Sequence, residues 1–178
     1  MSLAVAGLFL FNEKAFYGAV FFLIGHAVTS FALFFLIGAI YDRTKTRHIF
    51  SMGGLVQIMP LASSFLFIFV MLNAGFPLSL SFYAEFLVLS ALFVKCGALY
   101  IALLGASFVL LLYANIRLFT HICLGSVDPR RVSPASRDLS TIELYISALS
   151  FVYGANLFFN NEYYFWPLYL SSYGRYYI

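Results

Sequence analysis

The chain has 178 residues, of which 63% are hydrophobic and only 10% are charged. Soluble domains carry about 45–50% apolar and about 25% charged residues, so this composition excludes a water-soluble fold. The net charge of +3 comes from basic residues spread thinly along the chain, which excludes a nucleic-acid-binding face. Cys96 and Cys123 are too few for a disulfide framework and lack metal-site spacing, so we expect two small apolar residues near helix ends.

Long stretches of the chain carry no Asp, Glu, Lys or Arg, namely residues 15–41, 49–84, 96–116 and 144–161. A helix needs about 20 apolar residues to cross the roughly 30 Å hydrocarbon core. A membrane β-barrel would instead alternate polar and apolar residues, and the run from Phe65 to Leu72 does not alternate. Since backbone groups inside a bilayer must be paired internally, the predicted fold class is all-α, a polytopic transmembrane helix bundle.

The first apolar segment, residues 1–11, is too short to cross a bilayer and predicts half of a helix. No basic residue precedes it and no cleavage site follows it, which argues against a signal peptide. About five full spans are predicted after it, over residues 17–40, 55–74, 78–97, 98–119 and 139–159. The second and third are separated at Gly75-Phe76-Pro77, because proline supplies no N–H and clashes with the preceding turn.

We assign residues 1–160 to a single transmembrane helical domain. Residues 161–178 form an aromatic tail that contains the only tryptophan, which is typical of the headgroup level of a membrane. Two basic loops, 41–48 and 128–137, would both favour the same side of the membrane, but three predicted spans between them place them on opposite sides. We expect the second of these loops to be the one on the side that positively charged loops favour.

Glu85 is the strongest candidate for chemistry. It follows the predicted start of its span at Leu78 by seven residues, which is about 10 Å along a helix. An acidic side chain at such a depth costs on the order of 3 kcal/mol and usually faces a bundle interior, a water path or a partner charge. The alternative is a carboxylate at a helix end, and the choice depends on where the span begins.

His26 lies near the middle of the predicted span 17–40, with Thr29 and Ser30 about one turn further on. An imidazole titrates near neutral pH, and hydroxyls at this spacing could hold a chain of water molecules. The alternative is a buried histidine that is hydrogen-bonded to a neighbouring carbonyl.

The other charged residues have simpler interpretations. Lys95 and Arg117 lie near predicted helix ends, where their long side chains are expected to reach the membrane surface. Glu143 is expected to cap the first turn of the last span. The sequence contains no glycine-rich phosphate loop, nucleophile elbow or metal-ligand cluster, so it predicts no hydrolytic or redox chemistry within this chain.

A set of short motifs resembles the antiporter-like subunit 4 family of respiratory complex I, the NADH:ubiquinone oxidoreductase of mitochondria. The resemblance covers residues 1 to about 122 and rests on Gly25-His26-Ala27-Val28-Thr29-Ser30, Tyr41-Asp42-Arg43-Thr44-Lys45-Thr46-Arg47, Gly53-Gly54-Leu55, Met59-Pro60-Leu61, Phe76-Pro77, Ala84-Glu85-Phe86 and Tyr113. The chain departs from the family at Ala84, usually Gly, at Ser81, usually Asn, and at Lys45, often His. The last departure weakens any proton role for that loop.

The resemblance implies a subunit of the complex I membrane arm that moves protons along a hydrophilic axis during NADH oxidation by ubiquinone. It matches Glu85 to the family's exit-side carboxylate and His26 to its axis histidine. It implies a non-redox subunit of an H⁺-translocating enzyme in the mitochondrial inner membrane, surrounded by lipids and other membrane-arm subunits. Flavin, iron–sulfur clusters and ubiquinone are expected in other subunits, and no cofactor or metal is expected here.

Family members have about fourteen helices, so we expect this chain to be the C-terminal piece of a split subunit. A separate chain carrying the N-terminal helices is expected to bind against residues 1–40. Two alternatives stay open. One is a subunit of a related cation/proton antiporter or of a chloroplast-type complex. The other is a purely structural membrane-arm subunit, which would have no reason to keep an acid at the depth of Glu85.

Overall fold

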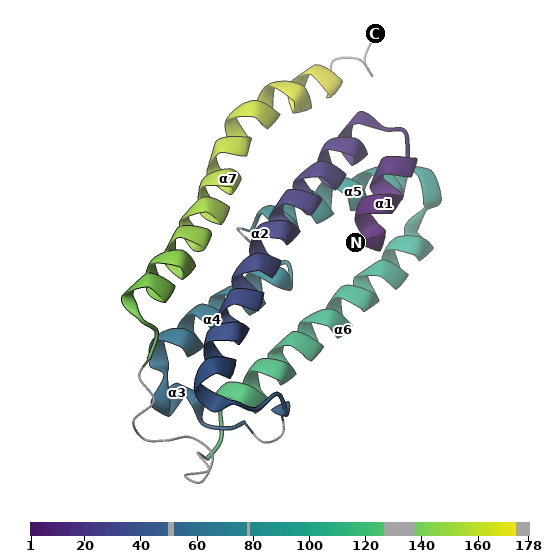
Figure 1. Ribbon diagram of the computed structural model, residues 1–178. Coiled ribbons are helices and arrows are strands. Elements are labelled where there is room, and N and C mark those ends of the chain that lie inside the picture. The colour runs from purple at the N-terminus through teal and green to yellow at the C-terminus, as the bar shows by residue number, and fades with distance from the viewer. Residues whose placement is uncertain (50–51, 78, 127–137, 174–178) are drawn as a thin grey trace.

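The computed structural model describes residues 1–49, 52–77, 79–126 and 138–173. These residues form seven α-helices and no strand, which confirms the all-α prediction. The helices are α1 Ser2–Phe9, α2 Glu13–Thr44, α3 Leu55–Ile58, α4 Pro60–Asn73, α5 Leu80–Cys96, α6 Ala98–Cys123 and α7 Thr141–Tyr173 (Figure 1). Three of them are long and apolar enough to cross a membrane, over Glu13–Thr44, Ala98–Cys123 and Thr141–Asn160.

Helix α2 is the central element of the bundle and contacts α1, α4, α5 and α7. It begins after Asn12, whose side-chain oxygen accepts a hydrogen bond from the backbone N–H of Lys14 at 3.0 Å. It ends at Lys45, whose backbone is left-handed (φ 51°) and donates to the carbonyl of Tyr41. Such a cap satisfies carbonyls that a helix end leaves unpaired. Helix α2 therefore runs the whole length of the bundle.

Small residues let α2 and α5 approach closely. A Cβ atom at Gly18 would lie 2.9 Å from Leu87 Cβ and 3.1 Å from the carbonyl oxygen of Ala84. Two turns further along α2, a Cβ atom at Gly25 would lie 3.1 Å from Ser81 Oγ. Membrane helices associate mainly through such close packing, because lipid offers no hydrophobic driving force between them. The antiparallel contact of α2 with α5 is thus fixed by glycine positions.

Helices α4 and α5 follow one another along α2 and do not lie side by side (Figure 1). Helix α4 packs on the C-terminal half of α2, where Leu66 and Phe69 join Leu36 in one buried cluster. Helix α5 packs on the N-terminal half, where Val88 joins Ala15 in a second cluster. With 14 and 17 residues, the two helices are about 21 and 26 Å long, each shorter than the roughly 30 Å hydrocarbon core.

The predicted spans 55–74 and 78–97 therefore form a single broken crossing, where the sequence analysis counted two. Gly75 at the break has a left-handed backbone (φ 74°), and the N–H of Phe76 bonds to the carbonyl of Met71. Pro77 follows directly. Helix α5 then continues along α2 in the same direction as α4 (Figure 1).

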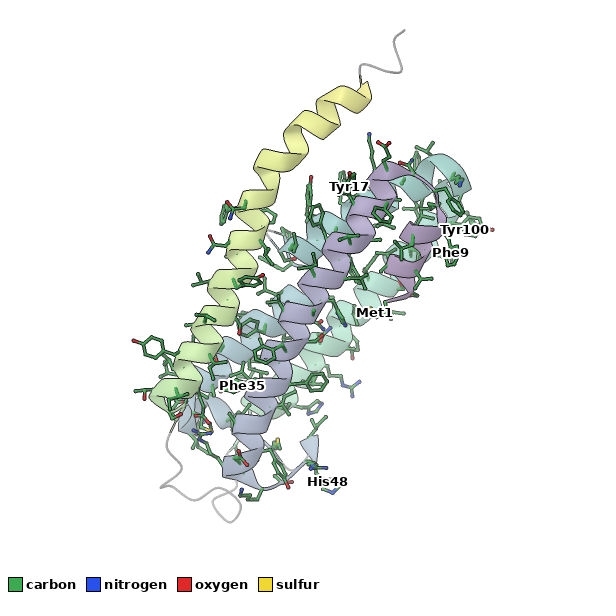
Figure 2. All side chains as sticks on the ribbon, turned by 45° about the horizontal axis from the view of Figure 1, so that its top comes forward. Met1, Phe9, Tyr17, Phe35, His48 and Tyr100 are labelled. Carbon is green, nitrogen blue, oxygen red and sulfur yellow. The ribbon has the colours of Figure 1, made fainter. Side chains whose placement is uncertain are left out.

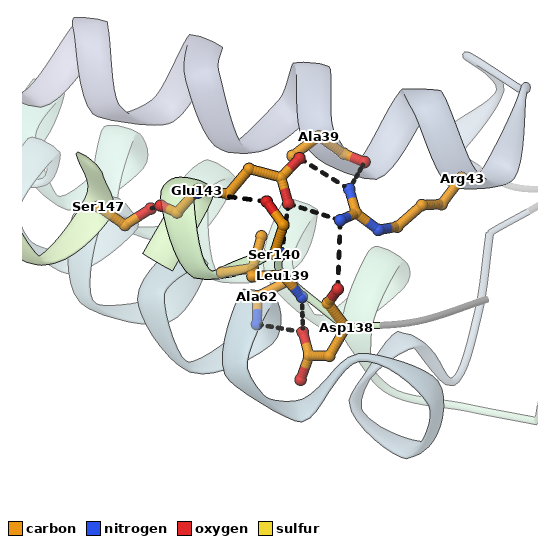
Figure 3. Close-up of polar contacts among 8 residues, drawn as sticks. All are labelled: Ala39, Arg43, Ala62, Asp138, Leu139, Ser140, Glu143 and Ser147. Atoms are coloured by element: carbon orange, nitrogen blue, oxygen red, sulfur yellow. Dashed lines mark hydrogen bonds and ion pairs between the residues drawn. The ribbon is translucent and has the colours of Figure 1, made fainter. Parts of the chain in front are cut away.

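One crossing fewer also changes the arrangement of the basic loops. Arg43, in the segment predicted as the first loop, contacts Asp138 and Glu143, which follow the second loop (Figure 3). The prediction that the two loops lie on opposite sides is therefore wrong, and the ends of both loops that the structure describes lie at the same end of the bundle. Residues 127–137 themselves lie outside the described residues. With both loops on one side, the positive charges no longer conflict.

The opposite end of the bundle carries exposed aromatic side chains, among them Phe9, Tyr17 and Tyr100, while His48 lies at the loop end (Figure 2). Aromatic rings are common at the level of lipid headgroups. Helix α1 is eight residues long, as the predicted half-helix requires. Cys96 and Cys123 are free and end α5 and α6, as predicted. Helix α7 continues to Tyr173, past the predicted boundary at residue 160, and the interfacial role of the tail stays a prediction.

Replacing Gly18 by Leu should destabilise the protein by about 1–3 kcal/mol, because the new side chain would be forced into Leu87 and Val88 of α5. Thermal unfolding of the detergent-solubilised protein measures the effect. Gly38→Ala is the matched control on the same helix, because nothing lies within 4 Å of a Cβ atom there. It should be neutral or stabilising by up to about 1 kcal/mol. Equal effects of the two substitutions would contradict a glycine-dependent contact.

Candidate functional site

The Glu85 side chain lies just beyond the break, in the second turn of α5. It is 8% exposed and points back at Gly75, where a Cβ atom would lie only 2.7 Å from Glu85 Oε2. Among the described residues, no hydrogen bond or ion pair reaches this carboxylate. Ala84, the position at which the resembled family usually has Gly, is fully buried. The structure thus places Glu85 between two half-helices inside the bundle, away from either of its ends.

This position decides between the two interpretations of Glu85. The structure starts α5 at Leu80, so Glu85 is five residues inside the helix, and α4 precedes it on the other side of the break. The start of α5 is only about 8 Å from Glu85, closer than predicted, but this helix end lies inside the bundle, where Glu85 is buried. A helix start in the middle of the bundle is an irregularity that membrane proteins tolerate only where protein or a cavity surrounds it.

His26 is half-buried on α2, and its ring lies parallel to that of Phe22, with a centroid separation of 6.1 Å. Within the described part of the chain, no hydrogen bond to this ring is found, so the carbonyl-bonded alternative receives no support. The hydroxyl of Thr29 donates to the carbonyls of Gly25 and His26 at 3.0 and 3.2 Å. Its proton is thus used on the helix backbone, but its oxygen can still accept a hydrogen bond from water.

Glu85 and His26 are brought near one level of the bundle by the contact of α2 with α5. Ser81 lies one turn before Glu85 and packs against Gly25, the residue that precedes His26. Among the described residues no direct contact joins the carboxylate to the imidazole, and the two side chains are linked through this small-residue contact. A proton passing between them would need water or a further side chain.

A cavity of about 470 Å³ lies beside the break, on the side of α7. Its wall is mostly apolar, but it carries the hydroxyl residues Thr29, Ser79, Ser81 and Ser150. Gly25 and Ser81 also line it, so it adjoins the contact between the two candidate residues, whose own side chains are not on its wall. Its size is sufficient for several water molecules or for a side chain of a neighbouring segment.

A second polar cluster lies at the loop end and joins α2, α4 and α7 (Figure 3). Arg43 forms two hydrogen bonds to Glu143, at 3.1 and 2.5 Å, and donates to the carbonyl of Asp138 at 3.2 Å. The carboxylate of Asp138 accepts from the backbone N–H groups of Leu61 and Ala62 in the first turn of α4. Glu143 also accepts from the N–H of Ser140, as its predicted capping role requires.

The remaining candidate cations lie apart from Glu85. Lys95 Nζ donates to the carbonyl of Leu10 at 2.8 Å, so it ties the end of α5 to the link between α1 and α2. The extension of Lys95 to the membrane surface stays a prediction. Lys45 is exposed, and its Nζ lies 3.6 Å from Oδ1 of Asp42. In the described residues, no three His, Cys, Asp or Glu side chains gather in a way that would hold a metal ion.

Residues 1–111 match the family described as "NADH:quinone oxidoreductase/Mrp antiporter, TM". The chain belongs to this family. It is 45% identical to "NADH-ubiquinone oxidoreductase chain 4" of Acanthamoeba castellanii over 93 residues, covering 52% of this chain and 19% of that protein. It is 36% identical to the protein of the same name from Chondrus crispus over 155 residues, covering 82% and 29%. The chain thus spans less than a third of the length of these relatives.

The fold of this family member is also found in a solved structure, that of the Mrp complex from Dietzia sp. DQ12-45-1b. The TM-score is 0.74 at 21% identity, and the match covers 88% of this chain and 37% of the other. The resemblance stated from the sequence is confirmed by these matches. The sequence singled out Glu85 and His26, whose roles stay predictions, and it placed the helix break at Gly75. It did not single out Asp138, although an acid just before a predicted helix is itself a capping signal.

Glu143→Gln should destabilise the protein by about 1.5–3 kcal/mol, because Arg43 would keep its charge in a place where only 18% of its side chain is exposed. The midpoint of thermal unfolding in detergent measures this. Asp42→Asn, one residue away from Arg43, is the matched control. It removes a carboxylate whose partner Lys45 is 71% exposed, so we expect less than about 1 kcal/mol. A larger loss in the control than in Glu143→Gln would contradict the assignment.

Proposed function

We propose that this chain is part of the antiporter-like subunit 4 of mitochondrial complex I and takes part in proton translocation coupled to NADH oxidation by ubiquinone. The names of the relatives support this proposal, since those above are called NADH-ubiquinone oxidoreductase chain 4. Their names also support a place in the mitochondrial inner membrane. The likeness to the Mrp complex concerns the fold alone, and a cation/proton antiporter remains the second candidate.

The observation that carries the proposal is the Glu85 carboxylate at the broken crossing. It is almost completely buried, and no hydrogen bond or ion pair within the described residues reaches it. Burying a charge without a partner is costly, whereas a carboxyl group that takes up and releases a proton avoids a permanent charge. A purely structural subunit gains nothing from an acid at this place. We therefore assign Glu85 to proton exchange.

His26 is the proposed second member of the path. A neutral imidazole has one nitrogen that can accept a proton and one that can donate it, and His26 lies on the helix that packs against the start of α5. The cavity lined by Thr29 and Ser81 offers room for water beside the contact between α2 and α5, although neither candidate side chain is on its wall. Water in such a place can transfer a proton between groups that do not touch.

The partners of the chain follow from the same proposal. The chain corresponds to less than a third of its relatives, so we propose that it works against helices equivalent to the rest of their length, in lipid and among other membrane-arm subunits. The sequence analysis expects these helices on a separate chain bound against residues 1–40, and this stays a prediction. Flavin, iron–sulfur clusters and ubiquinone are assigned to other subunits, with no cofactor in this chain.

In the intact complex, Glu85→Gln should lower the number of protons pumped per electron and slow coupled turnover by about tenfold or more, because an amide keeps the shape but cannot exchange a proton. Glu85→Asp should lose less. His26→Ala should slow turnover less than Glu85→Gln, since water can partly replace the imidazole. Proton uptake by reconstituted vesicles during NADH oxidation measures these effects.

Glu13→Gln is the matched control, because Glu13 is an exposed carboxylate at the start of α2. It should pump normally. A normal proton-to-electron ratio in Glu85→Gln would refute the role of Glu85 and favour a structural subunit. If NADH oxidation does not require this chain, and vesicles that contain it exchange sodium for protons, the antiporter is favoured.

A further inference from the structure

Helix α6 is the least buried of the helices that can cross the membrane. Among its described residues only Ile122 and Cys123, at its C-terminal end, are buried. Leu104 and Phe108 pack against the buried cluster that joins α1 and α5. The ring centroid of Phe119 lies 5.1 Å from that of Phe67 on α4. These contacts lie along one face of α6. The opposite face has nothing against it in the described part of the chain.

That opposite face carries a stripe of residues spaced three or four apart, which we call the outer stripe of α6: Leu99, Leu103, Ala106, Leu110, Tyr113 and Arg117. The three leucines and Tyr113 are between 59% and 72% exposed. Residues three and four apart form a continuous face on a helix. Leucine alone could face lipid, but the stripe ends in Arg117, whose charge does not suit lipid tails.

Arg117 lies inside the segment of α6 that can cross the membrane. It precedes the end of the helix at Cys123 by six residues, which is about 9 Å. An arginine at depth costs about 2.5–3.5 kcal/mol or more unless it is paired or reaches the surface. The position of its guanidinium group therefore decides whether Arg117 reaches the surface or needs a partner.

The guanidinium of Arg117 is turned toward the middle of the helix and away from the nearer end. Its Nη1 lies 3.5 Å from the hydroxyl oxygen of Tyr113, one turn earlier in the chain. This direction is the one a helix imposes, since side chains tilt toward the helix N-terminus. The membrane surface closest to Arg117 is at the C-terminal end of α6. The predicted extension to that surface would require the side chain to point the other way.

No carboxylate of the described residues balances this charge. The two ion pairs found there join Arg43 to Glu143 and Lys45 to Asp42. Arg43, which lies on helix α2, donates two hydrogen bonds to the carboxylate of Glu143. Within the described residues, the guanidinium of Arg117 reaches only the phenol of Tyr113, at the upper limit of a hydrogen-bond distance. The outer stripe therefore presents an apolar face with one unbalanced positive charge.

We propose that the outer stripe of α6 is an interface with another membrane helix, which carries an Asp or Glu side chain opposite Arg117. The carboxylate would accept two hydrogen bonds from the planar guanidinium, and the leucines would pack against apolar residues of the partner helix. A helix fits better than lipid, because anionic lipid groups lie at the surface while this guanidinium is turned inward. The inference is independent of the proton role of Glu85.

The first experiment joins the two partners covalently in the intact assembly in its native membrane. Arg117→Lys keeps the charge and supplies an amine. Dicyclohexylcarbodiimide, an apolar reagent, then activates a carboxylate in contact with that amine, and the amide that forms is located by mass spectrometry. We expect residue 117 to be linked to an Asp or Glu within an apolar helix. Asn156→Lys, at an exposed position of α7, is the matched control and should form no such link.

The absence of a link at residue 117, links only to lipid, or an equal yield in the Asn156→Lys control would overturn the proposal. A link to the same carboxylate in repeated preparations would identify the partner helix by its sequence. The result does not depend on pumping, so it is unaffected if the proposed function of the chain fails.

The second experiment measures retention of the chain in the assembly after extraction with dodecyl maltoside. Arg117→Gln should lower the retained fraction by about tenfold or more, because the partner carboxylate would be left without its cation. Arg117→Glu should lower it further, and Arg117→Lys should restore most of it. Arg47→Gln, outside the spans and against Tyr41, is the control and should not change retention. Unchanged retention in Arg117→Gln and Arg117→Glu would support surface extension and overturn the interface.

Discussion

The close contact of α2 with α5 is the constraint on which the rest of the structure depends. Gly18 and Gly25 remove the side chains that would hold the helices apart, and Ala84 and Ser81 face them from α5. Because α5 is bound along its length to α2, it needs no preceding helix of full length to hold it in the membrane. The bundle therefore tolerates the break at Gly75, and Glu85 next to the break stays inside the bundle. A larger residue at either glycine would move Glu85 relative to His26.

The break in turn decides what the site can do. A continuous helix would bond all its backbone groups internally and would leave a buried carboxylate against apolar side chains only. Here the carboxylate lies against the backbone of Gly75, in the second turn of α5 and near the cavity that reaches α7. The irregular backbone and the acid occur together, which is the arrangement expected where a polar path crosses hydrocarbon. The resembled family, the buried acid and the broken crossing therefore support one interpretation from separate observations.

Much of the fold could be predicted from the sequence, because apolar runs and charge-free lengths are local properties. The half-helix at the start, the long helix through His26 and the break before Pro77 all follow from such signals. The series arrangement of α4 with α5 could not be predicted, since two apolar segments of 14 and 17 residues are compatible with two tilted crossings as well as with one broken crossing. Glu85 was found because an acid in an apolar run is conspicuous. The contact of Gly75 with Glu85 and the capping role of Asp138 were not predicted, because each joins residues that are separated along the chain.

The cap that Asp138 provides has a consequence for the order of events during synthesis. The first N–H groups of α4, at Leu61 and Ala62, are bonded by a carboxylate that lies 77 residues after Leu61. At a synthesis rate of about 5–20 residues per second, the ribosome needs roughly 4–15 s to produce that carboxylate after Leu61. During this interval α4 can enter the bilayer, but its exposed start cannot be fixed to α7. The broken crossing is therefore locked only when the last long helix arrives, and a nascent chain stopped before Asp138 would leave it open to quality control.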